Sequence, residues 1–190
     1  MITQVYNKDI LRQFKDAYYK VFKNNDPFGE MFQDIIRKRI ILCPIDGFYL
    51  TKAQYEALLG AINAVQDDNI NISEVESQAD CFNICENNDK YQCQHWELVN
   101  NFTLYNDYSA LPIIVENAIY SPSGKWGILI SHEGHAVIGG TDKFVDAFKA
   151  LYPLWENGIK SFERQWDYNK NEYKSDVDWI PKLINHINNA

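Results

Sequence analysis

Apolar side chains recur at helical spacing along the first part of the chain. Within residues 7–24 they fall three and four positions apart and form one stripe, made of Ile10, Leu11, Phe14, Tyr18, Val21 and Phe22. This spacing predicts an amphipathic helix. Similar spacing predicts a second helix over 28–38, and the apolar residues 40–42 then predict the start of a buried strand.

Capping and alternation signals organise the next stretch. Thr51 and Gln54 have the spacing of a capping box, in which each side chain binds the other residue's backbone N–H. They predict a helix whose apolar face carries Tyr55, Leu58, Leu59, Ile62 and Val65. Residues 70–75 alternate between apolar and polar, which is typical of a half-buried strand. The polar stretch 77–94 is predicted to be a long loop, and 95–105 a returning strand.

The clearest pattern covers residues 111–152. It predicts three strands joined by short turns, at 113–120, 125–131 and 135–138. Pro122 and Gly124 fit the first turn, because proline fixes φ and glycine accepts a positive φ. The second strand is apolar throughout, so Trp126 is expected in the core. Thr141 is predicted to cap a helix with four inward apolar residues, namely Phe144, Val145, Phe148 and Leu151.

These elements predict an α+β fold, in which an antiparallel meander packs with helices from both ends of the chain. The tail is predicted to add two helical pieces, at 155–166 and 177–187. A length of 190 residues with 46% hydrophobic residues fits a single domain, 1–190. No stretch is apolar enough to span a membrane and no signal-peptide core is present, so we expect a cytoplasmic protein with free thiols.

Negative charge is concentrated in one segment. The net charge of the chain is −8, and residues 67–97 alone carry −7, against +2 for 1–66 and −3 for 98–190. Such a patch repels nucleic acid and anionic membranes and favours a basic partner. The alternative is that these acids only solvate loops. The candidate partner-binding residues are Asp67, Asp68, Glu74, Glu76 and Asp80, with Glu74 and Glu76 on one side of the predicted strand.

Trp166 is a further candidate, because it lies in the polar run 163–168. A partly exposed aromatic residue among charges is typical of protein interfaces. A tryptophan in this position also serves to dock a C-terminal helix on its own domain, and we favour docking.

His132, Glu133 and His135 invite a catalytic interpretation. Metalloproteases place two histidines four residues apart on a helix, so that both face one zinc ion. Here the histidines are three apart, with Gly134 between them, in a predicted turn. We therefore expect them to form local hydrogen bonds. The alternative is a small hydrolase or nuclease that uses these three residues for acid–base chemistry.

Four potential zinc ligands follow the acidic segment, namely Cys81, Cys85, Cys93 and His95. Their spacing, Cys-x3-Cys-x7-Cys-x-His, differs from the paired Cys-x2-Cys knuckles of common zinc sites. We therefore expect thiols and no cofactor. An adaptor held together by zinc is the alternative.

The residues around the predicted hairpin carry a resemblance. The run 116–127 (ENAIYSPSGKWG), followed by 130–135 (ISHEGH) and Gly139-Gly140, resembles bacterial immunity proteins of contact-dependent inhibition and polymorphic toxin systems. The resemblance covers about a fifth of the chain. It implies a non-catalytic protein that binds and occludes one cognate toxin domain. A toxin that cleaves nucleic acid needs a basic cleft, which an acidic inhibitor would cover.

Overall fold

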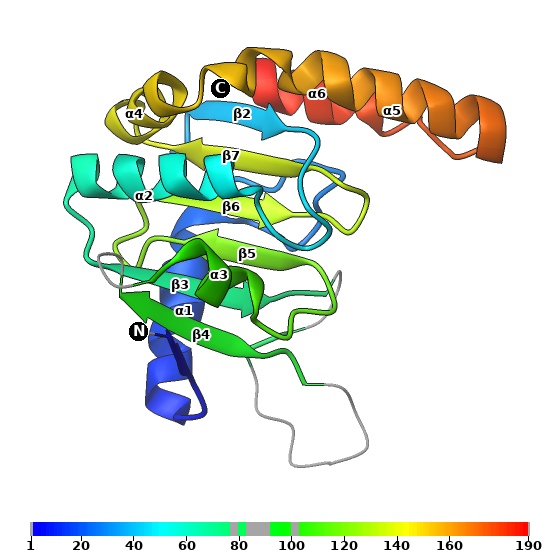
Figure 1. Cartoon of the computed structure of the whole chain (residues 1–190). Helices are drawn as coiled ribbons and strands as arrows, with labels where there is room; N and C mark the ends of the chain where they lie inside the picture. Colours follow the sequence, from blue (N-terminus) through cyan, green and yellow to red (C-terminus); the bar gives the residue numbers. More distant parts are fainter. Residues whose placement is uncertain (1, 77–79, 83–91, 100–102, 190) are drawn as a thin grey trace.

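The computed structural model describes residues 2–76, 80–82, 92–99 and 103–189, and its centre is a seven-stranded sheet (Figure 1). The strands are β1 (Ile2–Gln4), β2 (Lys38–Leu42), β3 (Asn69–Glu74), β4 (His95–Val99), β5 (Asn117–Tyr120), β6 (Trp126–Ile130) and β7 (Ala136–Gly140). Their order is β1-β4-β3-β5-β6-β7-β2, and every neighbouring pair is antiparallel. The predicted meander is confirmed as β5, β6 and β7.

Helices from both ends of the chain pack against this sheet, so the protein has the predicted α+β fold. They are α1 (Lys8–Val21), α2 (Lys52–Val65), α3 (Tyr105–Ser109), α4 (Asp142–Leu151), α5 (Gly158–Tyr173) and α6 (Ile180–Asn188), with the short 3-10 helix η2 (Pro153–Asn157) before α5. Thr51 forms the predicted capping box at the start of α2, and Thr141 caps α4 as predicted.

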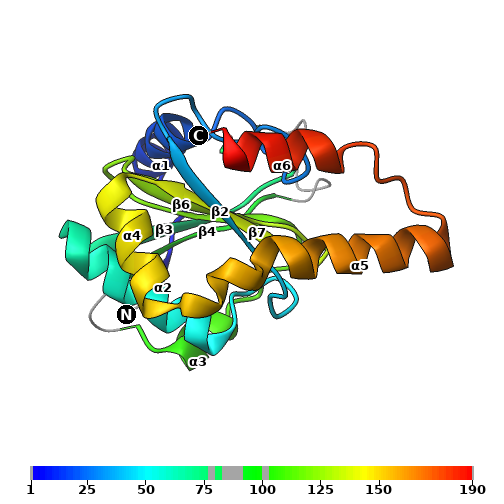
Figure 2. The same ribbon diagram turned by 90° about the horizontal axis from the view of Figure 1, so that it is seen from above.

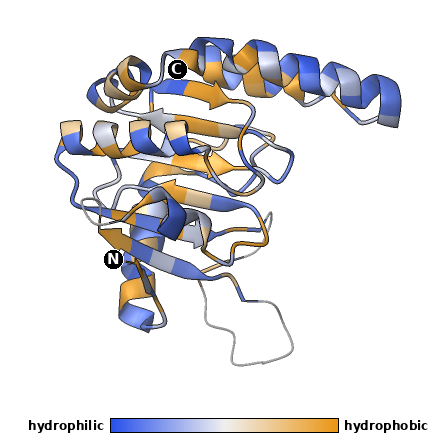
Figure 3. Cartoon of the chain, in the orientation of Figure 1, coloured by the Kyte–Doolittle hydropathy of each residue, from blue (hydrophilic) through white to orange (hydrophobic). Residues whose placement is uncertain are grey.

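The sheet has a hydrophobic core on each face. Helices α2, α3 and α4 cover one face, while α1 and α6 cover the other (Figure 2). Side chains alternate between the two cores along each strand, so Ile128 and Ile130 of β6 join the first core and Leu129 joins the second. Figure 3 accordingly shows apolar residues concentrated on the strands. The prediction that 70–75 is half-buried is wrong, because β3 is covered on both faces.

One edge of the sheet is covered by a helix. Helix α5 begins beside the edge strand β2, and the closest approach is at Gly158. A Cβ atom on this residue would lie 2.0 Å from the carbonyl oxygen of Ile41, so only glycine allows the helix to come this near. Covering an edge strand in this way protects its free backbone groups from pairing with another chain.

The predicted helix over 28–38 is wrong. This segment is irregular and makes its backbone hydrogen bonds with the end of α1, where Lys23 N–H donates to Met31 O and Gln33 N–H donates to Val21 O. Met31, Phe32 and Ile36 are still buried, whereas Phe28 is half-buried and Ile35 is exposed. The apolar spacing therefore predicted which side of the segment faces the core. It did not predict the backbone conformation, which depends on hydrogen bonds to the end of α1.

Three further boundaries differ from the predictions. The strand predicted at 95–105 ends at Val99, and a helix, α3, follows it. The strand predicted at 113–120 begins only at Asn117. Leu151, expected to point inward from α4, is exposed, because the helix ends there.

Trp126 lies fully buried in the first core, as predicted. Its ring stacks on Phe144 of α4 at 4.8 Å between centroids. Replacement by alanine would remove this contact and leave a cavity. We expect Trp126→Ala to lower the free energy of unfolding by about 3–5 kcal/mol, measured by urea denaturation. The control is Tyr168→Ala on the exposed surface of α5, and equal losses in both variants would contradict the packing described here.

Candidate functional site

Glu74 was predicted to form a negative ridge with Glu76, and the structure shows this to be wrong. The Glu74 side chain is fully buried and accepts hydrogen bonds from the backbone N–H groups of Gln94, at 2.9 Å, and Ile114, at 3.1 Å. The carboxylate therefore ties the segments before β4 and before β5 to the end of β3. Residues two apart on a strand do share a side, but at Glu74 that side faces the interior.

Asp67 is also a structural residue. Its side chain is only 9% exposed, and its carboxylate accepts hydrogen bonds from Ser121 Oγ at 2.6 Å and from Trp126 Nε1 at 2.9 Å. Ser123 Oγ and Lys125 Nζ approach the same carboxylate, at 3.2 Å and 3.6 Å. Asp67 thus holds the turn between β5 and β6, which explains why this turn is rich in serine. Little of its charge is left for a partner.

The remaining acids of the predicted patch do not form one surface. Asp68 is exposed, whereas Asp80 forms an ion pair with Lys15 of α1 at 2.8 Å. Glu76 is half-buried, and its backbone N–H and carbonyl bind Cys81 Sγ and Asn25. Asp68, Glu76 and Asp80 stay candidates for partner binding, but without the ridge that was expected.

Trp166 docks α5 on α6, which was the favoured interpretation. It is 6% exposed and packs edge-on against Trp179, at 4.9 Å between ring centroids. Phe162 contacts both rings from the same helix face. Since Trp166 is buried in this aromatic cluster, its proposed place in a partner interface is wrong for the folded chain.

The two histidines of the β6–β7 turn lie in different environments. His132 is on the surface, where its ring contacts the carboxylates of Glu116 and Glu133. His135 is fully buried, and its Nε2 donates to the carbonyl of Pro27 at 3.2 Å. The expectation of local hydrogen bonds therefore holds for His132 but not for His135, whose partner is 108 residues away. Sequence spacing gave no sign of Glu116 as the partner of His132.

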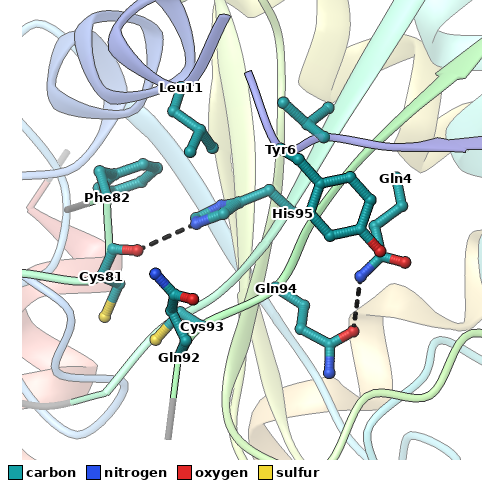
Figure 4. Close-up of a pocket in the computed structure, with 10 residues that line it drawn as sticks. Gln4, Tyr6, Leu11, Cys81, Phe82, Gln92, Cys93, Gln94 and His95 are labelled. Atoms are coloured by element: carbon teal, nitrogen blue, oxygen red, sulfur yellow. Dashed lines mark hydrogen bonds between the residues drawn. The ribbon is translucent and has the colours of Figure 1, made fainter. Parts of the chain in front are cut away.

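His95 has both ring nitrogens engaged by the protein. Nε2 donates to the carbonyl of Cys81 at 3.0 Å (Figure 4), and Nδ1 contacts Ser73 Oγ at 2.8 Å. Binding zinc through His95 would break one of these contacts. Within the described residues no group of three or more His, Cys, Asp and Glu side chains is placed to hold a metal ion. Cys85, one of the four potential ligands, lies outside the described residues.

An exposed surface around α3 escaped the sequence predictions. It consists of Asp46, Leu104, Tyr105, Asp107 and Ile114, and is called the α3 surface here. Leu104 is 72% and Ile114 61% exposed, although both are large and apolar. Both carboxylates reach solvent. The signal that could have located it is the distribution of cations, because residues 53–124 contain eleven Asp and Glu and a single Lys, a net charge of −10.

Buried aromatic residues lie beneath the α3 surface. Tyr108 is fully buried beneath it, stacks on Tyr55 of α2 at 4.5 Å, and accepts a hydrogen bond from Leu50 N–H at 3.0 Å. Burial and the nearby carboxylate of Asp46, in the loop after β2, raise the pKa of Tyr105 in α3. These contacts fix the positions of the exposed side chains before any partner arrives.

Comparison of the chain with protein families, with curated proteins and with solved structures found no match. Among the described residues, no helix combines the length and the apolar character that a membrane span requires.

Burial lowers the pKa of His135 from its ordinary value of 6.5 to about 4, so the folded protein keeps this ring neutral. The unfolded chain takes up a proton at higher pH. The free energy of unfolding should therefore decrease as pH falls from about 6.5 towards 4, by up to about 1.4 kcal/mol per pH unit for this histidine. Urea denaturation between about pH 7 and pH 5 measures the slope.

The variant His135→Gln should lose this part of the pH dependence. His95 is also buried with a pKa lowered to about 4, so some slope will remain. The matched control is His132→Gln, in the same turn but on the surface, which should leave the slope in place. A slope that responds to His132 and not to His135 would show that the buried ring has been assigned to the wrong residue.

Proposed function

We propose that this chain is a non-catalytic protein-binding module, an immunity protein that binds a cognate bacterial toxin domain and occludes it through the α3 surface. The observation that carries the proposal is the combination of Leu104 and Ile114, both strongly exposed, with acidic side chains in a stretch nearly free of cations.

The composition of the α3 surface suits a protein partner. Interfaces between proteins combine a central apolar contact with a polar rim, and large exposed apolar side chains grouped together mark such sites. Here Leu104 comes directly before Tyr105, the first residue of α3, and Ile114 lies on the segment between α3 and β5. Tyr105 is an aromatic residue of the kind that contributes strongly to binding. Asp46 and Asp107 supply the polar rim.

The charge of this region favours a basic partner. A toxin domain that cleaves nucleic acid presents cationic side chains to phosphate groups, and an acidic surface attracts them. Electrostatic attraction of this kind raises the association rate more than it slows dissociation. The α3 surface therefore takes the place of the predicted ridge on β3, and its Asp107 belongs to the acidic stretch 53–124. It implies a cytoplasmic location, where such a toxin reaches its substrate.

The resemblance to immunity proteins supports the class of function and not the surface. The residues that carry it, 116–127, 130–135 and 139–140, lie on the buried strands β5, β6 and β7 and in their turns. These strands build the scaffold, so they say nothing about which side chains contact the toxin. The α3 surface lies outside the resembling residues, as expected of a surface that is specific to one toxin.

The test uses the toxin domain encoded beside the gene of this chain, purified as an inactive variant. We expect Asp107→Lys to slow association roughly tenfold at low salt, and Leu104→Asp to weaken the affinity by about tenfold or more through faster dissociation. Stopped-flow kinetics at low and high salt separates the two effects. Both variants should also fail to protect cells that produce the active toxin.

The controls apply the same types of change to α5 and η2, as Glu172→Lys and Leu154→Asp, both at exposed positions. They should bind and protect like the unchanged chain. Normal binding by both α3 variants would place the interface elsewhere. A neighbouring toxin domain that neither binds the unchanged chain nor is neutralised by it would contradict the immunity function itself.

A further inference from the structure

Two cysteines meet at a cavity between the start of the chain and the β3–β4 connection. The cavity has a volume of about 230 Å³ and is lined by Gln4, Val5, Tyr6, Leu11, Cys81, Phe82, Gln92, Cys93, Gln94 and His95. Figure 4 shows both sulfur atoms at this cavity. Neither cysteine forms a disulfide in the structure, and both line this cavity.

The sulfur of Cys81 is surrounded by hydrogen-bond donors. The backbone N–H of Glu76 donates to it at 3.1 Å, and the side-chain amide of Asn25 approaches at 3.8 Å. The Cys81 thiol itself faces the carbonyl oxygen of Glu76, at 3.9 Å from sulfur to oxygen. Donors placed around a sulfur atom stabilise the thiolate, which is the reactive form of cysteine. Cys81 itself is only 6% exposed, so an oxidant that reaches it must be small.

The pKa values of Cys81 and Cys93 are shifted in opposite directions. The hydrogen bond from Cys93, followed by that of the Glu76 backbone, lowers the pKa of Cys81 below its ordinary value. The same hydrogen bond, together with burial, raises the pKa of Cys93. Cys81 is therefore the nucleophile, and Cys93 is the protonated neighbour that can attack once Cys81 has been oxidised. A reactive cysteine beside a resolving cysteine is the arrangement found in thiol redox sensors.

We propose that Cys81 and Cys93 form an oxidation site for small hydroperoxides, which converts the two thiols to a reversible disulfide between the ends of β3 and β4. The grounds are the placement of both sulfur atoms at one cavity and the donors around Cys81. This chemistry is independent of toxin binding, because the α3 surface uses none of these residues.

The reaction balances with hydrogen peroxide as the oxidant. The Cys81 thiolate attacks one peroxide oxygen, so that a sulfur–oxygen bond forms, the oxygen–oxygen bond breaks, and the departing hydroxide takes a proton to become water. Cys93 then loses its proton and attacks the sulfur of the resulting sulfenic acid. The sulfur–sulfur bond forms, and the hydroxyl group leaves as a second water. The two thiols lose two electrons in total, and the peroxide gains them.

Cys43 is a matched control within the same chain. It is buried, donates to Gln165 at 3.4 Å, and burial raises its pKa to about 11. At neutral pH its thiolate fraction is on the order of a hundredfold below that of a thiol with a pKa under 9. Cys81 should therefore react with peroxide at least about a hundredfold faster than Cys43 if access is equal.

The experiment treats the reduced full chain with hydrogen peroxide and quenches samples over time with an alkylating agent. Mass spectrometry should show the loss of two hydrogen atoms, and peptide mapping should assign the disulfide to Cys81 and Cys93 while Cys43 stays reduced. A thiol reductant should reverse the change. The experiment is repeated in a Cys85→Ser background, so that the assignment does not depend on that cysteine.

The variant Cys93→Ser separates the two steps. It should stop at the sulfenic acid of Cys81, which a dimedone probe captures, and circular dichroism verifies that the variant is folded. The proposal is overturned if Cys43 oxidises as fast as Cys81, if the folded Cys93→Ser variant gives no adduct at Cys81, or if the disulfide excludes Cys81 or Cys93. Faster oxidation by glutathione disulfide than by peroxide would also overturn it, because the site would then admit a large oxidant.

Discussion

Helices cover both faces of the antiparallel sheet, so polar side chains on its strands lie away from water and depend on partners inside the protein. A hydrogen-bond network at β3 and β4 supplies such partners. His95 is neutral and donates from Nε2 to Cys81, so its Nδ1 accepts from Ser73, whose hydroxyl also contacts Tyr120 at 2.9 Å. Glu74 receives two backbone N–H groups in the same layer. These contacts fix the register of the strands.

The same constraint decides where function can lie. Acids on covered strands or beneath turns, such as Glu74 and Asp67, stabilise the fold and have little surface to offer a partner. We propose that recognition falls to segments at the margin of the layers, above all the α3 surface, where Leu104 and Ile114 are exposed. The Cys81 site lies at another margin, where the chain enters β4. Burial, and not sequence position, thus separates the described acids of 67–97 that stabilise the fold from those at the surface.

The sequence predicted those parts of the fold that local chemistry controls. Thr51 and Thr141 cap their helices through hydrogen bonds to residues only three positions later in the sequence. The Pro122–Gly124 turn is held by its own residues and by Asp67. The segment 28–38 could not be predicted, since its backbone pairs with the end of α1. The burial of Glu74 was equally hidden, because alternation along β3 shows one covered face at most and the second cover comes from distant residues.

Among the described residues, the acids of 67–97 divide into internal and surface groups. Urea denaturation of Glu74→Gln and Asp68→Asn tests it directly, because each substitution removes one carboxylate charge with little change of shape. The account predicts a loss of about 1.5–3 kcal/mol in the free energy of unfolding for Glu74→Gln, whose backbone donors lose a charged acceptor. For the exposed Asp68→Asn it predicts a change within about 0.5 kcal/mol. Equal, small effects in both variants would contradict it.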